Sequence, residues 1–242
     1  MSAQLLISHD RAMSNPYAFR AADNWADGFY ELAIEVGPRS DARLQRVLTA
    51  VWSAADVQGC FGDRSREPQE QEPVECTVES LAMFGHLQGQ VRLPTGQLVV
   101  CGCVAILEDG ADTIDWLDFY IPLGALHRTG IAYHESGQQF YRSRVLDDWF
   151  AAVGTEAFRR ADFHAGYIGF ETSGCTDAAT LNGRMPESRG IGYLLPQDGE
   201  LRYGAANDCP WVTSKLGSGT DLGDWSRRVI PGLLRGEAVR WF

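Results

Sequence analysis

Residues 29–37 read FYELAIEVG, and their alternating apolar side chains have the period of a β-strand. Residues 116–124 read WLDFYIPLG and follow the same plan: an aromatic residue first, an acid two places later, alternate apolar residues and a closing glycine. The apolar faces of the two stretches correspond, with Leu32, Ile34 and Val36 in the first and Phe119, Ile121 and Leu123 in the second. The two stretches therefore predict equivalent strands in an internal duplication.

A second match predicts a helix in each half of the chain. RVLTAVWSA at residues 46–54 and RVLDDWFAA at residues 144–152 both place apolar residues at helical spacing. Ser40 is the expected N-cap of the first helix, because a serine hydroxyl accepts a hydrogen bond from the free backbone N–H groups of the first turn. Asp147 and Asp148 are expected to face water in the opening turn of the second helix.

A third match, LPTGQL at residues 93–98 and LPQDGEL at residues 195–201, predicts a hairpin turn in each half, since proline and glycine supply the backbone angles of tight turns. Each half then has the order strand, helix, strand, strand, and residues 166–171 add a strand to the second half. We therefore predict an α+β fold: a tandem duplication of a βαββ unit that forms a mostly antiparallel sheet, or paired sheets, with helices on one side. Chance similarity of short apolar patterns is the alternative to the duplication.

The duplication also sets the expected domain organisation. Residues 1–110 would form the first βαββ half, with an acidic, mobile loop at residues 62–79. Residues 111–242 would form the second half, with a longer loop at residues 125–140 and a basic C-terminal segment. The two halves are expected to form one compact domain.

The composition disfavours several classes of partner. The chain has 242 residues, with 21 Lys plus Arg against 32 Asp plus Glu and a formal net charge of −11. This balance disfavours DNA and RNA, because nucleic-acid binding depends on basic side chains that neutralise phosphates. The sequence has no signal-peptide pattern and no apolar run of bilayer length, so we expect a cytoplasmic protein without a membrane partner. Arginine supplies all basic residues but one, which is typical of a GC-rich bacterial genome; the oligomeric state stays open.

The six cysteines are expected to be free thiols and not a disulfide framework, since no secretion signal accompanies them. Cys101 and Cys103 form the one closely spaced pair, and residues two apart on a strand share a face. The two sulfurs are weak candidates for a metal site, and the alternative is two small buried apolar side chains. No histidine pair has metal-binding spacing, so we predict no metal and no cofactor.

The second face of the duplicated strands carries the candidate binding residues. Phe29 and Glu31 lie on it in the first copy, and Trp116, Asp118 and Tyr120 lie on it in the second. A carboxylate among aromatic rings suits a cationic ligand or a basic side chain of a partner, since charge pairing and cation–π attraction act on the same group. A later strand adds a third acid beside an aromatic residue, Glu171 with Tyr167. The alternative is an amphipathic strand whose second face is covered by a loop or meets solvent.

Catalytic motifs are weak, and Ser173, for example, lacks the GxSxG pattern of a nucleophilic serine. In layout, the doubled unit resembles the tandem modules of GyrI-like effector-binding domains, in which an acid among aromatic residues accepts cationic ligands. It resembles the vicinal oxygen chelate enzymes less, because their His and Glu ligand set has no counterpart here.

We therefore expect a non-enzymatic binding protein that uses the cleft between its halves. The cleft would hold a cationic small molecule or a basic protein surface. Toxin inhibitors and immunity proteins are typically acidic proteins that bind a basic protein surface. The alternative is a hydrolase or a metal-assisted lyase that uses the carboxylates of the same cleft as acid and base.

Overall fold

The computed structural model describes residues 18–107, 113–129, 131, 142–207 and 240–241. Its strands are β1 (Phe29–Pro38), β2 (Gln58–Phe61), β3 (Leu87–Arg92), β4 (Leu98–Leu107), β5 (Ile114–Pro122), β6 (Ala165–Phe170), β7 (Gly192–Gln197), β8 (Glu200–Gly204) and β9 (Arg240–Trp241). Its α-helices are α1 (Asp41–Ala54), α2 (Val78–Phe84), α3 (Leu123–Leu126), α4 (Arg144–Phe158) and α5 (Ala178–Leu181), and its 3-10 helices are η1 (Ala22–Trp25) and η2 (Pro68–Glu70). The predicted longer loop at 125–140 and the basic C-terminal segment fall largely outside the described residues.

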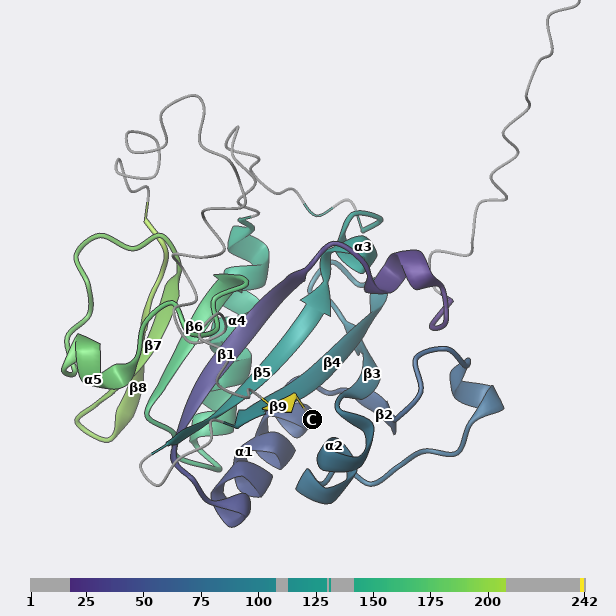
Figure 1. The fold of residues 1–242 in the computed structure, drawn as a ribbon. Coiled ribbons are helices and arrows are strands. Elements are labelled where there is room, and N and C mark those ends of the chain that lie inside the picture. The colour runs from purple at the N-terminus through teal and green to yellow at the C-terminus, as the bar shows by residue number, and fades with distance from the viewer. Residues whose placement is uncertain (1–17, 108–112, 130, 132–141, 208–239, 242) are drawn as a thin grey trace, which may run out of the picture.

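The described strands form one sheet in the order β2-β3-β4-β5-β1-β6-β7-β8, with β9 beside β4 (Figure 1). Every pair in it is antiparallel. Strands β5 and β6 flank β1, so both edges of β1 are paired. The α+β fold and the mostly antiparallel sheet that the sequence predicts are confirmed.

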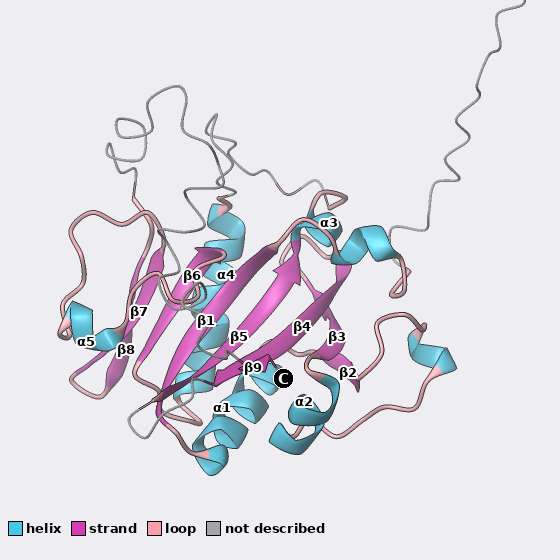
Figure 2. Ribbon diagram, viewed as in Figure 1, coloured by secondary structure: helices cyan, strands magenta, loops and turns pink. Residues whose placement is uncertain are grey.

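The two long helices lie on one face of the sheet. Helices α1 and α4 pack against each other and both contact β1, as Figure 2 shows. The apolar face that the sequence predicts is in this core: Leu32, Ile34 and Val36 are buried, and the ring of Phe119 lies 5.9 Å from that of Phe150 in α4. No helix in the described part of the chain is long and apolar enough to cross a membrane.

Three local features explain where the central elements begin and end. The Ser40 hydroxyl accepts a hydrogen bond from the backbone N–H of Arg43, which confirms the predicted N-cap of α1. Gly37, with φ at +117°, lies where the β1–β5 register shifts, a backbone conformation that favours glycine. A Cβ atom at Gly124 would collide with the backbone of Asp23, so η1 packs directly on α3.

The tandem duplication stays a prediction. Leu32 and Phe119, which the repeat makes equivalent, are direct partners across β1 and β5. The elements that follow the helices differ, because α1 is followed by β2 at one edge of the sheet, whereas α4 is followed by β6 next to β1. The acidic segment at residues 62–79 also carries more structure than its composition predicts, since it includes η2 and the start of α2.

Asp147 is buried, which corrects the expectation that it faces water. The hydroxyl of Tyr30, which reaches across from β1, donates a hydrogen bond to Asp147 Oδ1 at 2.5 Å and accepts one from the backbone N–H of Ser143 at 3.1 Å. Burial raises the pKa of Asp147. Asp148 is exposed, as predicted, and pairs with Arg144 at 2.8 Å. The sequence pattern of α4 alone did not reveal the partner that β1 supplies.

We predict that Tyr30→Phe lowers the free energy of unfolding by about 1–3 kcal/mol, because the buried Asp147 carboxyl and the Ser143 N–H both lose a partner. Urea denaturation measures the change. Tyr203→Phe is the matched control: its hydroxyl lies 3.4 Å from Asp148 in an exposed contact, and its loss should cost less than about 0.5 kcal/mol. Equal losses in the two variants would contradict the role of Tyr30.

Candidate functional site

The sequence-predicted binding residues do share one side of the sheet, the face opposite α1 and α4. The register places Glu31 opposite Tyr120, and it places Ala33 between Asp118 on β5 and Tyr167 on β6. Direct partners in an antiparallel pair point to the same face. Phe29 and Trp116 continue this face along β1 and β5, whereas Glu171 follows β6 and its side chain is exposed.

Two buried carboxyl groups on this face meet at one serine. The Ser173 Oγ atom lies 2.8 Å from Glu31 Oε1 and 2.6 Å from Asp118 Oδ2. Glu31 and Asp118 are each only 3% exposed. A serine hydroxyl has a single hydrogen, so it can donate to only one of the two carboxyl groups.

The remaining donors decide which carboxyl group is ionised. Glu31 Oε1 also accepts the backbone N–H groups of Thr172 at 2.6 Å and Ser173 at 2.9 Å, and such bonds stabilise a carboxylate. Asp118 Oδ1 is buried without a hydrogen-bond partner among the described residues. We infer that Glu31 carries the charge and that Asp118 is protonated and donates to Ser173 Oγ.

Electrostatics agree with this assignment. Burial is the main cause that raises the pKa of Asp118 well above its usual range, and the neighbouring charge of Glu31 raises it further. Burial also raises the pKa of Glu31, but the hydrogen bonds from Ser173 and Thr172 oppose that shift. The two carboxyl groups share the Ser173 hydroxyl, and their surroundings favour an ionised Glu31 and a neutral Asp118.

The chain reaches Glu31 through a sharp turn at the end of β6. Glu171 has a φ of +45°, and its backbone N–H still bonds to the Phe29 carbonyl at 3.1 Å. The left-handed residue turns the next two N–H groups toward the Glu31 carboxylate.

Glu35 lies four residues after Glu31 on the same face of β1, and it also accepts a hydrogen bond from the segment after β6. Its Oε2 accepts the backbone N–H of Ala178 at 2.6 Å and the hydroxyl of Tyr167 at 3.4 Å. Its Oε1 lies 3.6 Å from Nδ1 of His164. Glu31 and Glu35 together therefore hold residues 172–178 against this face of the sheet, at the start of segment 171–191.

A small second core forms beneath the fastened segment. Trp116 and Tyr167 lie with their ring centroids 5.6 Å apart, and Leu181, Met185 and Ile191 of the segment pack against this cluster. The region around Trp116 is covered by apolar residues of this segment, which agrees with the alternative that the sequence left open, an amphipathic strand whose second face is covered by a loop or meets solvent.

The other aromatic residues of the predicted site pack beside it. The ring centroids of Phe29 and Tyr120 are 4.2 Å apart, and the Tyr120 hydroxyl lies 2.9 Å from Nδ1 of His86. Burial lowers the pKa of His86, and the nearby charge of Arg64 adds to that shift. Tyr120 is therefore a buried, hydrogen-bonded side chain and not an open aromatic platform.

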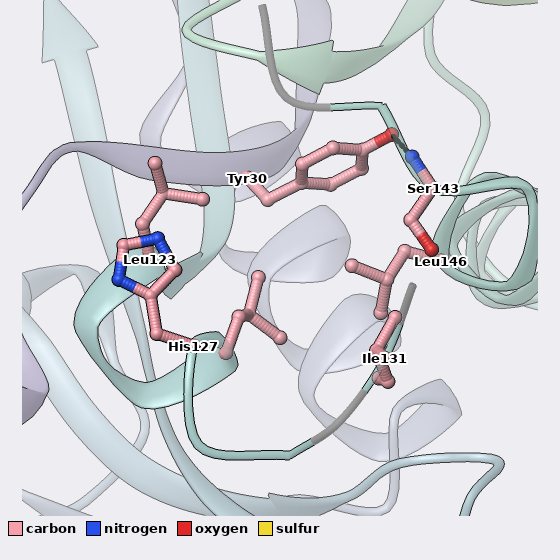
Figure 3. A pocket seen from close by; sticks show the side chains of 7 residues that line it. Tyr30, Leu123, His127, Ile131, Ser143 and Leu146 are labelled. Atoms are coloured by element: carbon pink, nitrogen blue, oxygen red, sulfur yellow. Dashed lines mark hydrogen bonds between the residues drawn. The ribbon is translucent and has the colours of Figure 1, made fainter. Parts of the chain in front are cut away.

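The described cavities lie elsewhere. One, of about 10 Å³, lies between Tyr30, His127 and Ser143 (Figure 3), and it has room for one water molecule and none for a cofactor. An open groove of about 370 Å³ runs along α4 beside Asp148 and Tyr203. Neither includes the predicted binding residues.

In the described part of the chain, no group of three or more His, Cys, Asp or Glu side chains is placed to hold a metal ion. Cys101 and Cys103, the weak metal candidates, are fully buried on β4. Burial raises the pKa of both thiols, which favours their neutral form.

Sequence reasoning missed the groups that complete the carboxylate site. Ser173 lacks the GxSxG motif, so its sequence context does not indicate this role, and the backbone N–H groups of Thr172 and Ala178 leave no trace in a residue pattern. One signal was available: acids on a strand with apolar neighbours on both sides need donors, and the run Thr172-Ser173-Gly174 follows the strand at residues 166–171.

No protein-family model matches the chain, and comparison with curated proteins and with solved structures finds no match either.

We predict that Asp118→Asn becomes more stable relative to the wild type as the pH rises. A carboxyl group whose pKa is raised in the folded state contributes stability that is present below about pH 4, its unfolded pKa, and is lost as the pH rises through the folded value. An amide does not titrate, and its N–H₂ group can still donate to Ser173. Urea denaturation at several pH values between about 4 and 8 measures the difference.

Asp162→Asn is the matched control, because Asp162 is exposed and a surface change of this kind alters stability by less than about 0.5 kcal/mol. A difference between Asp118→Asn and the wild type that stays constant with pH would show that Asp118 is ionised in the folded protein.

Proposed function

We propose that the protein is a non-enzymatic binding protein that takes a basic protein surface, in the manner of a toxin inhibitor or immunity protein. The observation that carries this proposal is an ordered acidic surface at one edge of the sheet, formed by segment 62–79 and α2. Six acids and two arginines lie in this segment. A fixed acidic surface attracts a basic partner and speeds its capture.

The acids of this segment are available to a partner. Glu70, Glu72, Glu75 and Glu79 are all exposed, and in Figure 1 the segment projects beyond β2. Glu70 lies 3.4 Å from Arg20, whereas Glu72, Glu75 and Glu79 form no ion pair with any described residue. Their charges are therefore not neutralised by neighbours in the described part of the chain.

The segment is held in place, so its charges have fixed positions. The Gln71 side-chain amide donates hydrogen bonds to the carbonyls of Asp63 at 2.7 Å and Arg66 at 3.0 Å. Glu67 accepts the backbone N–H groups of Phe19 at 3.0 Å and Arg20 at 3.3 Å. A partner would lose little free energy in ordering this surface.

An apolar side chain lies next to these charges. Met83 on α2 is 75% exposed, the highest value among the large apolar residues described as exposed. Phe84, beside it, is 40% exposed. Interfaces combine a central apolar contact with a charged rim, and methionine adapts its shape to a partner.

The cationic small molecule is the less favoured ligand. It would need the cleft of Glu31, Asp118 and Trp116, and these side chains are buried beneath residues 171–191. A ligand there would have to displace the hydrogen bonds that Glu31 and Glu35 accept from that segment. A basic surface needs no such displacement at segment 62–79.

A thermal-shift screen with basic proteins, an oligoarginine peptide and small organic cations tests the proposal, because a ligand that prefers the folded state raises the melting temperature. For a basic protein that binds, we predict that Glu72→Lys with Glu75→Lys weakens binding about tenfold or more, and that affinity falls steeply between about 50 and 200 mM salt.

The matched control is Glu187→Lys with Glu200→Lys, which changes the net charge equally at exposed positions near β7 and β8. Calorimetry should give an affinity within about twofold of the wild type for this pair. Equal weakening by both pairs of substitutions would mean that only the net charge matters, and would reject segment 62–79 as the binding surface.

A carboxylate-based hydrolase is the second candidate, favoured by the neutral Asp118 beside the ionised Glu31. Such a pair can supply an acid and a base at one pH. A panel of chromogenic esters and glycosides tests it. Glu31→Gln and Asp118→Asn should each lower any turnover about 100-fold or more, and Glu187→Gln should leave it unchanged. Turnover that survives both site substitutions rejects this candidate.

A further inference from the structure

We propose that residues 172–182, the strap, form a proton-controlled cover, which lies docked on the sheet while Asp118 is neutral and lifts from it when Asp118 ionises. The juxtaposition that carries this proposal is one hydroxyl group between two buried carboxyl groups. Ser173 Oγ lies 2.8 Å from Glu31 Oε1 and 2.6 Å from Asp118 Oδ2. The proposal is independent of what segment 62–79 binds.

The strap is attached to the sheet chiefly through carboxyl groups. Glu31 accepts the backbone N–H groups of Thr172 at 2.6 Å and Ser173 at 2.9 Å. Glu35 accepts the backbone N–H of Ala178 at 2.6 Å. Hydrogen bonds to charged groups are among the stronger ones, so the ionisation state of this site decides how firmly the strap is held.

Apolar contacts add less to the docking of the strap. Ala178 and Leu181 are the strap residues that pack against the second small core, and both are only half-buried. Gly174 and Cys175 are exposed. A segment with few buried apolar contacts opens at a lower free-energy cost than the core of the domain.

The two ends of the strap are marked by backbone turns. Glu171, which precedes it, has a φ of +45°, and Asn182, which closes it, has a φ of +48°. The chain beyond Asn182 is held separately, because Arg189 donates hydrogen bonds to the carbonyls of Ala205 at 2.7 Å and Pro186 at 2.6 Å. The strap can therefore lift while the segment that follows it keeps its own contacts.

The proton on Asp118 completes the hydrogen bonds of the docked state. A neutral Asp118 donates to Ser173 Oγ, and the single hydroxyl hydrogen of Ser173 is then free to bond to Glu31. When Asp118 ionises, one of the two carboxylates faces the lone pairs of the serine oxygen. Asp118 Oδ1 has no hydrogen-bond partner among the described residues that would stabilise the new charge. Lifting of the strap lets water solvate it.

The surroundings of Asp118 offer no compensating positive charge, since it forms no ion pair with any residue in the described part of the chain. Its charged neighbour is Glu31 on β1, and Glu171 adds a further negative charge near Glu31. The titratable side chains on the other elements around the site are neutral, because burial raises the pKa of each: Cys103 on β4, Tyr120 on β5, Tyr167 on β6 and Cys175 on the strap.

The charges on the far side of Tyr120 do not alter this balance. Burial lowers the pKa of His86, so His86 is neutral at neutral pH. The charge of Arg64 acts on Tyr120 and His86.

The direction of the pH effect follows from the state that binds the proton more tightly. The pKa of Asp118 is raised in the docked protein and falls toward its usual value once water reaches the group, so lifting releases one proton. Docking is therefore strongest at low pH and weakens as the pH rises toward the docked pKa. In that range the ratio of lifted to docked molecules rises about tenfold per pH unit.

Hydrogen–deuterium exchange of the full-length protein between about pH 5 and 9, corrected for the intrinsic pH dependence of amide exchange, tests the proposal. We predict that the protection of the Thr172 and Ser173 amides falls about tenfold or more across this range, because lifting breaks their bonds to Glu31. The amides of β1 should keep their protection.

Asp118→Asn removes the titrating group and keeps a donor to Ser173, so its strap amides should stay protected over the whole range. Asp162→Asn, the exposed matched control, should keep the pH dependence of the wild type. Ser173→Ala removes the shared hydroxyl, and the Thr172 amide should then be less protected than in the wild type even at about pH 5.

Three results would overturn the proposal. The first is wild-type protection at Thr172 and Ser173 that does not change with pH, and the second is the same pH-dependent loss in Asp118→Asn as in the wild type. The third is a parallel loss of protection in β1, because the whole domain and not the strap would then be opening.

Discussion

Strand β1 is paired along both edges and covered on both faces, so each polar group on it must find its partner within the protein. Glu31 and Glu35 are the groups that make this requirement costly, because an isolated buried carboxylate is strongly unfavourable. The chain meets the requirement with backbone N–H groups of the segment after β6. These bonds hold residues 172–178 against β1, and the apolar residues that follow in the segment cover the second small core on the face that the sequence suggested as a cleft.

The strands and the core were readable from the sequence because they depend on periodicity. Leu32 and Phe119 fall on the helix-covered face as their alternation indicates, and Ser40 caps α1 as its residue type indicates. The burial of Asp147 was not readable, since the Tyr30 hydroxyl comes from a strand more than a hundred residues earlier. The same limit applies to the carboxylate site, where the donors are backbone groups that no residue pattern records.

Two groups of acids in this protein have opposite physical roles. Glu31, Glu35 and Asp118 are buried, and the hydrogen bonds that they form are made within the protein. Glu70, Glu72, Glu75 and Glu79 of segment 62–79 are exposed to water, where their charges act over about 8 Å at physiological salt. The sequence pattern favours Glu31 and Asp118 as binding residues because they lie beside aromatic residues. Because Glu31 and Asp118 are buried, we propose the exposed acids of segment 62–79 as the binding residues instead.

The position of β1 in the sheet also bears on how the protein is synthesised. Both of its neighbours come later in the chain, β5 at Ile114–Pro122 and β6 at Ala165–Phe170. The ribosome therefore releases β1 long before either of its neighbouring strands is made. Until then this apolar strand lacks the hydrogen-bonded neighbours that it has in the folded sheet. Long-range pairing of this kind slows folding and exposes the nascent chain to aggregation. The central strand of the folded sheet is therefore prone to aggregation early in translation.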